Sequence, residues 1–294
     1  MVLAIDIGNT NIVIGCIQNK ECLFVERLST VHQKTEIEYA IDIKTVLDIY
    51  HIDVEQIEGG IISSVVPQVT NAAKLALEKI LKKNVMVVGA GVKTGLNIRM
   101  DNPSSVGSDL IVGAVAGVAQ YPVPLIIFDL GTANTVCVID KNKDYIGGMI
   151  YPGIQVSVDS LTSNASQLSG ISLEAPKQII GKNTVDCMKS GVIYSSASAM
   201  DGIIDRMEEA LGEKATVVAT GGLAKKIVPH CKREITLDDD LLLKGLAIIY
   251  DKNVSTNRKY SNLQKLLELH ARKHYNGVQI RNKSSGSGVS PNWR

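Results

Sequence analysis

The sequence predicts an α/β protein made of two duplicated lobes with a cleft between them. The first observation is an internal echo, because residues 5–14 read IDIGNTNIVI and residues 127–136 read IFDLGTANTV. The second is that each copy opens three short β-rich segments, which helical patterns and further strands then follow. The third is composition: 45% of the 294 residues are hydrophobic but two are Phe and one is Trp, so aliphatic side chains must fill the buried strands.

Local signals predict the elements of the first half. Thr35 and Glu38 have the capping-box spacing that begins a helix, and Pro67 is favoured as the first residue of the next one. Gly8-Asn9 is a turn signal between two strands. We therefore expect, in order, strands at residues 2–7, 11–17 and 22–29, a helix from residue 35, a strand at 60–66, a helix at 67–80 and a strand at 85–88.

The second half repeats this order after a helix of small residues at 110–120. Asp238 and the two acids after it form a negative helix start, which suits the helix dipole. We expect strands at 124–129, 135–140 and 144–150, a helix after residue 152, a long helix at 184–211, a strand at 215–219 and a helix at 238–250. The predicted lobes are residues 1–115 and 116–251, followed by a basic, flexible C-terminal extension at 252–294.

The charge distribution separates the body of the chain from its tail. Residues 252–294 carry nine Lys or Arg and one acid, Glu268, whereas residues 1–251 carry 22 basic and 29 acidic residues, a net charge of −7. The body therefore gives no reason to expect a nucleic-acid partner. Two interpretations stay open for the tail, which are a loosely ordered extension and a dock for an acidic surface or membrane face.

Other features predict a cytoplasmic protein that does not enter a membrane. No apolar run reaches the roughly 18 residues needed to cross a bilayer, and the chain begins in a strand without the basic segment of a signal peptide. The cysteines are scattered without a C-x-x-C pair, which favours free thiols over a zinc site; they are Cys16, Cys22, Cys137, Cys187 and Cys231.

The two echoed turns are suited to binding phosphate. Gly8 and Gly131 leave no side chain in the way and can take backbone angles that other residues avoid. A phosphate can then approach the N–H groups and the Thr and Asn side chains of each turn. The preceding carboxylates, Asp6 and Asp129, are tolerable there if they hold a cation such as Mg²⁺. An ordinary hairpin explains either copy alone, but the pair in register favours a shared nucleotide site.

Three further segments carry candidate residues. Asp109 lies at the start of the small-residue helix, where it either contacts the helix N-terminus or acts as a general base toward a hydroxyl group. The glycine-rich run at 147–153 either admits a ligand or packs a strand against a helix. Thr220-Gly221-Gly222 follows a strand and lets a nucleotide approach, although the chain has neither a dinucleotide fingerprint nor a P-loop.

Together these segments resemble the acetate and sugar kinase, Hsp70 and actin superfamily, and within it they are similar to the type III pantothenate kinases. The resemblance covers residues 1 to about 251. It rests on D-I-G-N-T-N at 6–11, S-S-V-V-P at 63–67, D-N-P-x-x-V-G-x-D at 101–109, D-L-G-T at 129–132, G-G-x-I-x-P-G at 147–153, G-x-N-T at 181–184 and A-T-G-G-L-A at 219–224. It implies two ribonuclease H-like, actin-like ATPase lobes.

The implied activity is ATP-dependent phosphorylation of pantothenate to 4'-phosphopantothenate, the first step of coenzyme A biosynthesis, by a homodimer. Asp109 would be the proton acceptor, Asp129 the ligand of a monovalent cation (K⁺ or NH₄⁺), and Asp6 would lie near Mg²⁺. The predicted ATP- and phosphate-binding positions, which include the glycines after the later strand, are Asp6, Ile7, Gly8, Asn9, Thr10, Asn11, Ile12, Val13, Thr132, Gly221 and Gly222. The predicted substrate-binding positions are Gly107, Ser108, Asp109, Leu110 and Thr184.

The chain departs from the family pattern mainly on the acceptor side. Leu110 stands where the family has Arg, whose planar fork pairs with a carboxylate, and Met100 stands where Tyr is often found. The second hairpin reads G-T-A-N-T instead of G-T-A-T-T. The sequence therefore also leaves open a kinase for a different small hydroxyl compound, or a non-catalytic relative that binds ATP or a metabolite as a regulator.

Overall fold

The structure is a computed structural model that describes residues 1–255. Residues Met1–Tyr250 form one compact unit, and Asp251–Arg294 form a second unit of which residues 251–255 are described, as helix. The predictions made for the tail at 252–294 therefore lie almost wholly outside the described residues. Within the described part, no helix is both long and apolar enough to cross a membrane.

The first sheet has five strands in the order β3-β2-β1-β4-β5. Antiparallel pairing joins β1 to β2 and β2 to β3, and parallel pairing joins β1 to β4 and β4 to β5. The strands are β1 (Val2–Ile7), β2 (Asn11–Gln18), β3 (Glu21–Ser29), β4 (Gly59–Ser64) and β5 (Val85–Val87). The three-strand meander and the two later strands predicted from the sequence are confirmed.

The second sheet repeats this topology with one additional strand, in the order β11-β10-β7-β8-β9-β6. Antiparallel pairs join β7 to β8 and β8 to β9, while β10 pairs with β7 and β11 in parallel. The strands are β6 (Asn97–Ile98), β7 (Leu125–Leu130), β8 (Ala133–Ile139), β9 (Asp144–Pro152), β10 (Thr216–Thr220) and β11 (Thr236–Leu237). The duplication read from the sequence is thus confirmed, whereas the two-residue strands β6 and β11 were not predicted.

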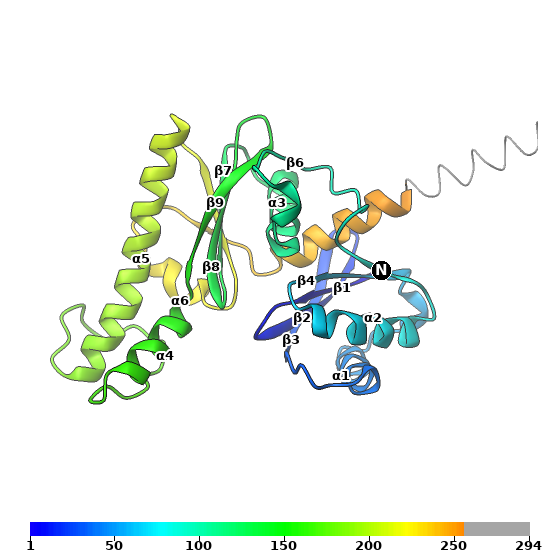
Figure 1. The fold of residues 1–294 in the computed structure, drawn as a ribbon, viewed down its shortest axis with the longest axis horizontal. Coiled ribbons are helices and arrows are strands. Elements are labelled where there is room, and N and C mark those ends of the chain that lie inside the picture. Colours follow the sequence, from blue (N-terminus) through cyan, green and yellow to red (C-terminus); the bar gives the residue numbers. More distant parts are fainter. Residues whose placement is uncertain (256–294) are drawn as a thin grey trace, which may run out of the picture. The chain divides into compact units, whose positions relative to one another are not determined.

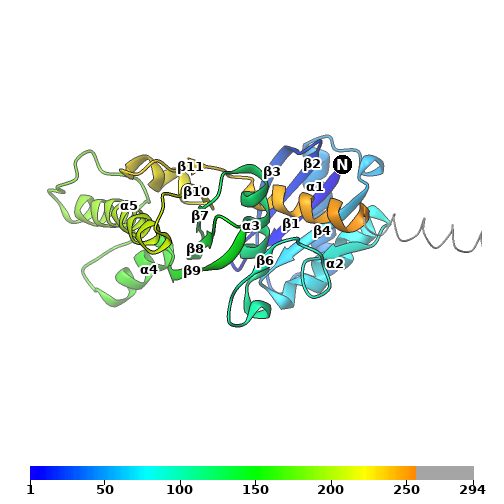
Figure 2. The ribbon, with the colours of Figure 1, turned by 90° about the horizontal axis from the view of Figure 1, so that it is seen from above.

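Helices cover both sheets (Figure 1, Figure 2). They are α1 (Glu36–Ile49), α2 (Pro67–Leu81), α3 (Ser108–Gln120), α4 (Ile154–Asn164), α5 (Thr184–Leu211), α6 (Ala224–Ile227) and a helix from residue 241, with 3₁₀ turns at Val54–Gln56, Pro103–Ser105 and Val228–His230. α1 and α2 share a hydrophobic core with the first sheet, and α4, α5 and α6 share one with the second.

Helix α3 lies between the two sheets, and its small residues explain how it fits there (Figure 2). Val112 and Val115 pack in the core that contains strands of the first sheet, and Ala114 packs with strands of the second. At Gly117 an added Cβ would lie 2.5 Å from the Ile127 side chain, so a larger residue would push the helix off the sheet. The small-residue helix therefore holds the two lobes at close range.

The last helix of the first unit starts later than the sequence suggested. We predicted residues 238–250, but the helix begins at residue 241. The buried Asp238 carboxylate instead accepts a hydrogen bond from the Tyr121 hydroxyl at 2.7 Å and contacts Lys244 Nζ at 2.8 Å. Residues Leu243 and Leu246 of this helix pack in the core that includes the first sheet. The lobe boundaries near residues 115 and 251 stay a proposal.

Candidate active site

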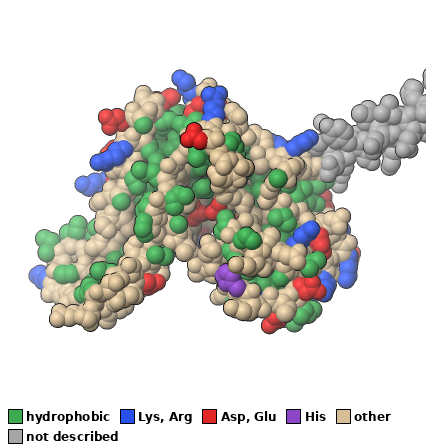
Figure 3. Space-filling model, viewed as in Figure 1, with side chains coloured by type: hydrophobic (Ala, Val, Ile, Leu, Met, Phe, Trp, Pro, Cys, Tyr) green, Lys and Arg blue, Asp and Glu red, His purple; other side chains and the backbone are tan. Residues whose placement is uncertain are grey.

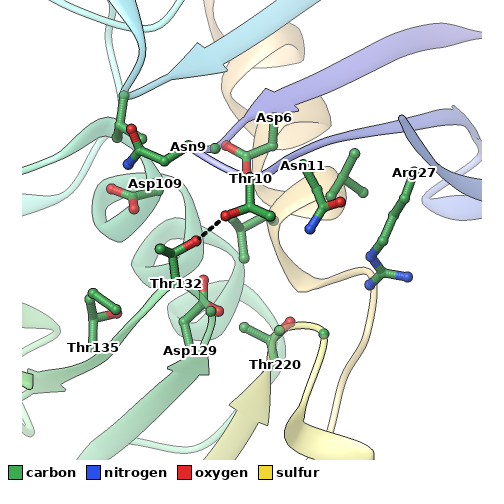
Figure 4. Close-up of a pocket in the computed structure, with 18 of the residues that line it drawn as sticks. Asp6, Asn9, Thr10, Asn11, Arg27, Asp109, Asp129, Thr132, Thr135 and Thr220 are labelled. Atoms are coloured by element: carbon green, nitrogen blue, oxygen red, sulfur yellow. Dashed lines mark hydrogen bonds between the residues drawn. The ribbon is translucent and has the colours of Figure 1, made fainter. Parts of the chain in front are cut away.

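Both hairpin turns face one cavity of about 200 Å³ (Figure 4). Gly8 of the β1–β2 turn and Gly131 of the β7–β8 turn both line it, as the echo in the sequence predicted. Across the cavity the hydroxyl groups of Thr10 and Thr132 share a hydrogen bond, with their Oγ1 atoms 2.7 Å apart. The lining residues are Asp6, Gly8, Asn9, Thr10, Asn11, Val13, Arg27, Val65, Asp109, Asp129, Gly131, Thr132, Ala133, Thr135, Thr220, Gly221, Gly222, Asp239, Leu242 and Leu243.

The first turn is held by its own backbone and by the end of β3. The Gly8 N–H donates to the Asn11 carbonyl at 2.9 Å, which closes the turn. Thr30 braces it from outside, because its hydroxyl donates to the Gly8 carbonyl at 2.7 Å and its N–H donates to the Thr10 carbonyl at 3.0 Å. The Thr and Asn side chains of the turn are therefore presented to the cavity on a fixed backbone.

The second turn is held by the glycine-rich segment at residues 147–153. The Gly153 N–H donates to the Thr132 carbonyl at 3.1 Å, and an added Cβ at Gly153 would lie 2.1 Å from that same oxygen. At Gly148, within β9, an added Cβ would lie 1.8 Å from the Val136 carbonyl oxygen. Of the two interpretations left open by the sequence, close packing is the one that the geometry of this segment supports.

The turn after β10 brings backbone against Asp129. Gly221 has φ +94°, a conformation that other residues rarely adopt, and an added Cβ would lie 2.4 Å from Asp129 Oδ1. Around Gly222, in contrast, there is open space for a Cβ. A side chain at residue 221 would thus clash with the cavity wall, whereas a side chain at residue 222 would find open space.

The carboxyl groups of Asp6, Asp109 and Asp129 converge on the cavity, and the charge of Asp109 adds to burial in raising the pKa of the other two (Figure 3, Figure 4). Burial, followed by the charge of Asp109, raises the pKa of Asp6 to about 7. The same two causes raise the pKa of Asp129 to about 6, against the opposing charge of Arg27. Burial also raises the pKa of Asp109. A site that holds three such groups favours either protons or a bound cation.

The position of Asp109 is compatible with both of the roles considered from the sequence. Its Oδ1 accepts a hydrogen bond from the Leu110 N–H at 2.9 Å, in the first turn of α3. The side chain nevertheless lines the cavity beside the two hairpins. Contact with the helix N-terminus and an orientation toward a ligand are therefore compatible.

Six predicted site residues do not line the cavity. Ile7 and Ile12 are buried in the core of the first lobe. The others are Gly107, Ser108, Leu110 and Thr184. The Ser108 hydroxyl lies 3.0 Å from that of Ser63 and ties α3 to β4, and Thr184 is the exposed first residue of α5. Leu110 packs beside the core between α3 and the second sheet. Their predicted roles stay predictions.

Other lining residues were missed, and strand register was the signal that could have found the most important of them. Asp6 pairs with Val13, and Val13 pairs with Arg27, so these three side chains form one row across β1, β2 and β3. Directly paired residues share a face of the sheet. Asp239 reaches the cavity from the turn before the last helix, and Leu242 and Leu243 reach it from the first turn of that helix. The sequence indicated a helix start here but not its contact with the cavity.

The described residues contain no cluster of side chains that could by itself bind a metal ion. Within residues 1–255, no three His, Cys, Asp or Glu side chains are close enough together to hold a metal ion among themselves. All five cysteines are free thiols, as predicted. A cation in this cavity would therefore take most of its ligands from water or from phosphate oxygens.

Comparison with known proteins agrees with this geometry. A family model of type III pantothenate kinase matches residues 2–206. The chain is 46% identical over 253 residues to a type III pantothenate kinase of Exiguobacterium sp., covering 86% of this chain and 99% of the relative. It is 44% identical over 254 residues to that of Halalkalibacterium halodurans, covering 86% of this chain and 100% of the relative.

A solved structure supports the fold independently. A Campylobacter jejuni protein assigned to the Baf family of transcriptional activators superposes with a TM-score of 0.54 at 18% identity, covering 86% of this chain and 99% of its own. At that identity the likeness concerns the fold alone, and it agrees with two ribonuclease H-like lobes. The family match and the two relatives carry the assignment further: the chain belongs to the type III pantothenate kinase family.

Proposed function

We propose that this chain transfers the γ-phosphate of ATP to the primary hydroxyl of pantothenate, which yields 4'-phosphopantothenate in the first step of coenzyme A biosynthesis. The observation that carries the proposal is 46% identity to a type III pantothenate kinase across 86% of the chain. The cavity adds physical support, because two glycine turns and four aspartates line it. Phosphoryl transfer needs chiefly positioning and electrostatic stabilisation, which such a site can supply.

Asp109 is the proposed proton acceptor. It would take the proton of the pantothenate hydroxyl as that oxygen attacks the γ-phosphorus, and ADP would leave. Its raised pKa supports this role, because a carboxylate with a raised pKa is a stronger base than one in water. Its bond to the Leu110 N–H fixes the carboxyl group at the start of α3, so the base does not have to be oriented at each turnover.

Asp6 and Asp129 are the proposed cation-binding residues, for Mg²⁺ and for K⁺ or NH₄⁺ respectively. The donor set fits, since burial and the charge of Asp109 raise both pKa values, and a cation would offset the negative charge that gathers there. Mg²⁺ commonly binds through one or two carboxylates plus phosphate oxygens, which suits a cavity without three clustered ligands. When bound, these cations would neutralise charge on the phosphates.

The nucleotide would lie between the hairpins and beside the turn after β10, and its binding would require the lobes to separate slightly. The cavity holds about 200 Å³, less than the roughly 300 Å³ at the lower end of ligand pockets. The Thr10–Thr132 hydrogen bond, with the Oγ1 atoms 2.7 Å apart, joins the two turns. We infer that a triphosphate replaces this contact with bonds from each hydroxyl to phosphate.

The acceptor side supports the alternatives that the sequence left open. Leu110 packs against apolar neighbours and offers no charge to the carboxylate of pantothenate. Loss of one charge-assisted contact costs about 1.5–3 kcal/mol, so weaker pantothenate binding, another hydroxyl acceptor or a regulatory role are each compatible with this residue. The remaining machinery is unaffected, since Leu110 does not line the cavity.

A homodimer is the proposed assembly. Beyond Tyr145, the edge of β9 that faces away from β8 has no strand beside it among the described residues, because β6 pairs with Asp144 and Tyr145 alone. Hydrophobic side chains are exposed on this strand and on the segment before α5: Met149 (43%), Ile150 (74%), Ile179 (61%) and Ile180 (77%). Such an exposed apolar edge favours pairing with a second copy. The absence of charge from these four residues suits a self-complementary interface.

A coupled ADP-release assay with and without pantothenate tests the proposal. We expect ADP release to require pantothenate and to match the formation of 4'-phosphopantothenate by mass spectrometry. K⁺ or NH₄⁺ should increase the rate over Na⁺. ATP binding without pantothenate-dependent ADP release would instead support the regulatory alternative, and activity gained in Leu110→Arg would then locate the change at the acceptor side.

A further inference from the structure

Arg27 has a position in the cavity that the proposed mechanism does not use. It lies on β3, at the end of the register row that starts at Asp6 and passes through Val13. Neighbouring strands are about 4.8 Å apart, so the Cα atoms of Arg27 and Asp6 are roughly 10 Å apart on the same face of the sheet. Figure 4 shows the guanidinium directed into the space between Asn11 and Thr220.

The guanidinium of Arg27 is not engaged by the protein. The backbone N–H of Arg27 donates to the Glu26 carboxylate, but its guanidinium makes no hydrogen bond or ion pair with any residue in the described part of the chain, and the residue is exposed. The Asp239 carboxylate, which also lines the cavity, pairs instead with Lys225 Nζ at 2.5 Å. Five N–H donors of Arg27 thus remain available to a ligand.

The charge balance of the cavity shows what kind of ligand Arg27 suits. Four aspartates and one basic residue, Arg27, line the cavity within the described chain. Because the charge of Arg27 lowers the pKa of Asp129 without forming an ion pair, the guanidinium is near the carboxylates but uncommitted. A polyphosphate entering this acidic cavity needs a fixed positive charge, and the planar guanidinium fork matches phosphate oxygens.

We propose that Arg27 is a nucleotide-positioning residue that binds the polyphosphate of ATP at the end of the cavity away from Asp109. This inference rests on the proposed function, since it presumes that ATP is the nucleotide bound. Asp109 and Arg27 lie on opposite sides of Thr10 in Figure 4, and Gly221 and Gly222 line the cavity with Arg27. The acceptor hydroxyl must meet Asp109, so the phosphates nearer the nucleoside would meet Arg27.

Calorimetric titration of the full chain with ATP, ADP and adenosine tests this assignment. We expect Arg27→Gln to weaken ATP and ADP binding about 10- to 100-fold, as expected for loss of a charge-assisted bidentate contact, and to change adenosine binding less than about 3-fold. Arg27→Lys should recover part of the loss, because a lysine keeps the charge but not the fork. Arg206→Gln is the matched control, since Arg206 is exposed on α5 and bonds to the Gly202 carbonyl of its own helix.

Steady-state kinetics separate a nucleotide role from an acceptor role. We expect Arg27→Gln to raise the KM for ATP at least about 10-fold while the KM for pantothenate stays within about 3-fold. An ATP affinity equal to that of Arg206→Gln would overturn the inference, and so would a rise confined to the KM for pantothenate. If Arg27→Gln weakened adenosine binding as much as ATP binding, the inference would also be wrong, because Arg27 would then support the shape of the site and not contact the phosphates.

The two levels of inference fail in different ways. If the wild-type chain phosphorylates pantothenate and Arg27→Gln keeps its ATP affinity, the role of Arg27 is wrong and the function stands. If ATP binding depends on Arg27 but pantothenate is not phosphorylated, the acceptor is wrong and the role of Arg27 stands. Absence of any ATP binding by the wild-type chain would overturn both.

Discussion

Replacing Gly221 by alanine tests whether the turn after β10 is shaped by Asp129. Gly221 has φ +94°, and a Cβ there would lie 2.4 Å from Asp129 Oδ1 and 2.6 Å from the Leu130 nitrogen. The Leu130 nitrogen cannot yield easily, because Leu130 belongs to the central strand β7, whereas the Asp129 carboxyl group borders the cavity and has room to move. We expect Gly221→Ala to destabilise the ligand-free protein and to displace the Asp129 carboxyl group.

The magnitude has two parts. A left-handed conformation costs a non-glycine residue about 1–2 kcal/mol, and an extra methyl group in a closely packed site typically costs about 1–3 kcal/mol. The free energy of unfolding should therefore fall by about 2–5 kcal/mol. For a unit of this size each kcal/mol lowers Tm by roughly 2–4 °C, so the fall in Tm should be about 4–20 °C.

Gly222→Ala is the matched control, since it adds the same methyl group one residue later into open space. Urea unfolding followed by circular dichroism should place Gly222→Ala within about 0.5 kcal/mol of the wild type. If Gly221→Ala proves as stable as Gly222→Ala, the backbone of this turn can relax away from Asp129, and the argument that Gly221 is dictated by that contact is wrong.

Three further predictions concern catalysis, pH and assembly. Asp109→Asn keeps an acceptor for the Leu110 N–H, so it should lower kcat at least about 100-fold with little change in Tm, and near-normal turnover would exclude Asp109 as the base. Burial alone would raise the pKa of Glu208, but hydrogen bonds from Arg233 and Lys214 lower this pKa to about 2. The ionised Glu208 therefore stabilises the folded state above pH 4.5, and this stabilisation is lost as the pH falls toward 2. Urea unfolding at pH 6 and pH 3 should show a fall of up to about 2 kcal/mol that is smaller in Glu208→Gln, and equal falls would contradict this. Ile180→Asp should dissociate the proposed dimer in sedimentation, whereas an unchanged sedimentation coefficient would place the interface elsewhere.

Local signals predicted most of the fold because they act within a few residues. Pro67 begins α2 and α5 spans residues 184–211 as expected, since helix starts depend on neighbouring residues. The missed strands depend on distant partners: β6 exists because Asn97 pairs with Asp144 and bonds to its carboxylate. The late start of the last helix also depends on a distant partner, because the Asp238 carboxylate accepts a hydrogen bond from Tyr121, 117 residues earlier in the chain.

The site residues that were predicted also depend on local signals, and those that were missed depend on distant partners. The hairpins were predictable because turn, glycine and carboxylate lie within a few residues of one another. Arg27 was not, because it enters the cavity through pairing across three strands and no motif surrounds it. The packing role of Gly153 was also open until the structure placed it against the Thr132 carbonyl. Residues whose role depends on register are found only when the pairing of all three strands is followed, whereas residues in turns are recognised from their neighbours in the chain.

Comparing the two lobes position by position shows why the cavity has two unlike ends. Asp6 pairs with Val13, which pairs with Arg27; in the second lobe Asp129 pairs with Thr135, which pairs with Ile150. Arg27 and Ile150 are therefore equivalent positions of the duplication.

The lobes face each other, so their third strands lie toward opposite ends of the cavity, and Figure 4 shows Arg27 and Thr135 on opposite sides. One end of the cavity thus carries the Arg27 guanidinium, which suits a polyphosphate. The third strand at the other end, β9, continues to Ile150, which is 74% exposed on the edge proposed to contact a second copy. We infer that the difference between Arg27 and Ile150 at this register position helps to separate the proposed nucleotide and acceptor sides of the duplicated fold. On this reasoning Arg27→Gln should affect the nucleotide alone and a substitution at Ile150 the acceptor alone, and steady-state kinetics in which both variants raised the same KM would refute it.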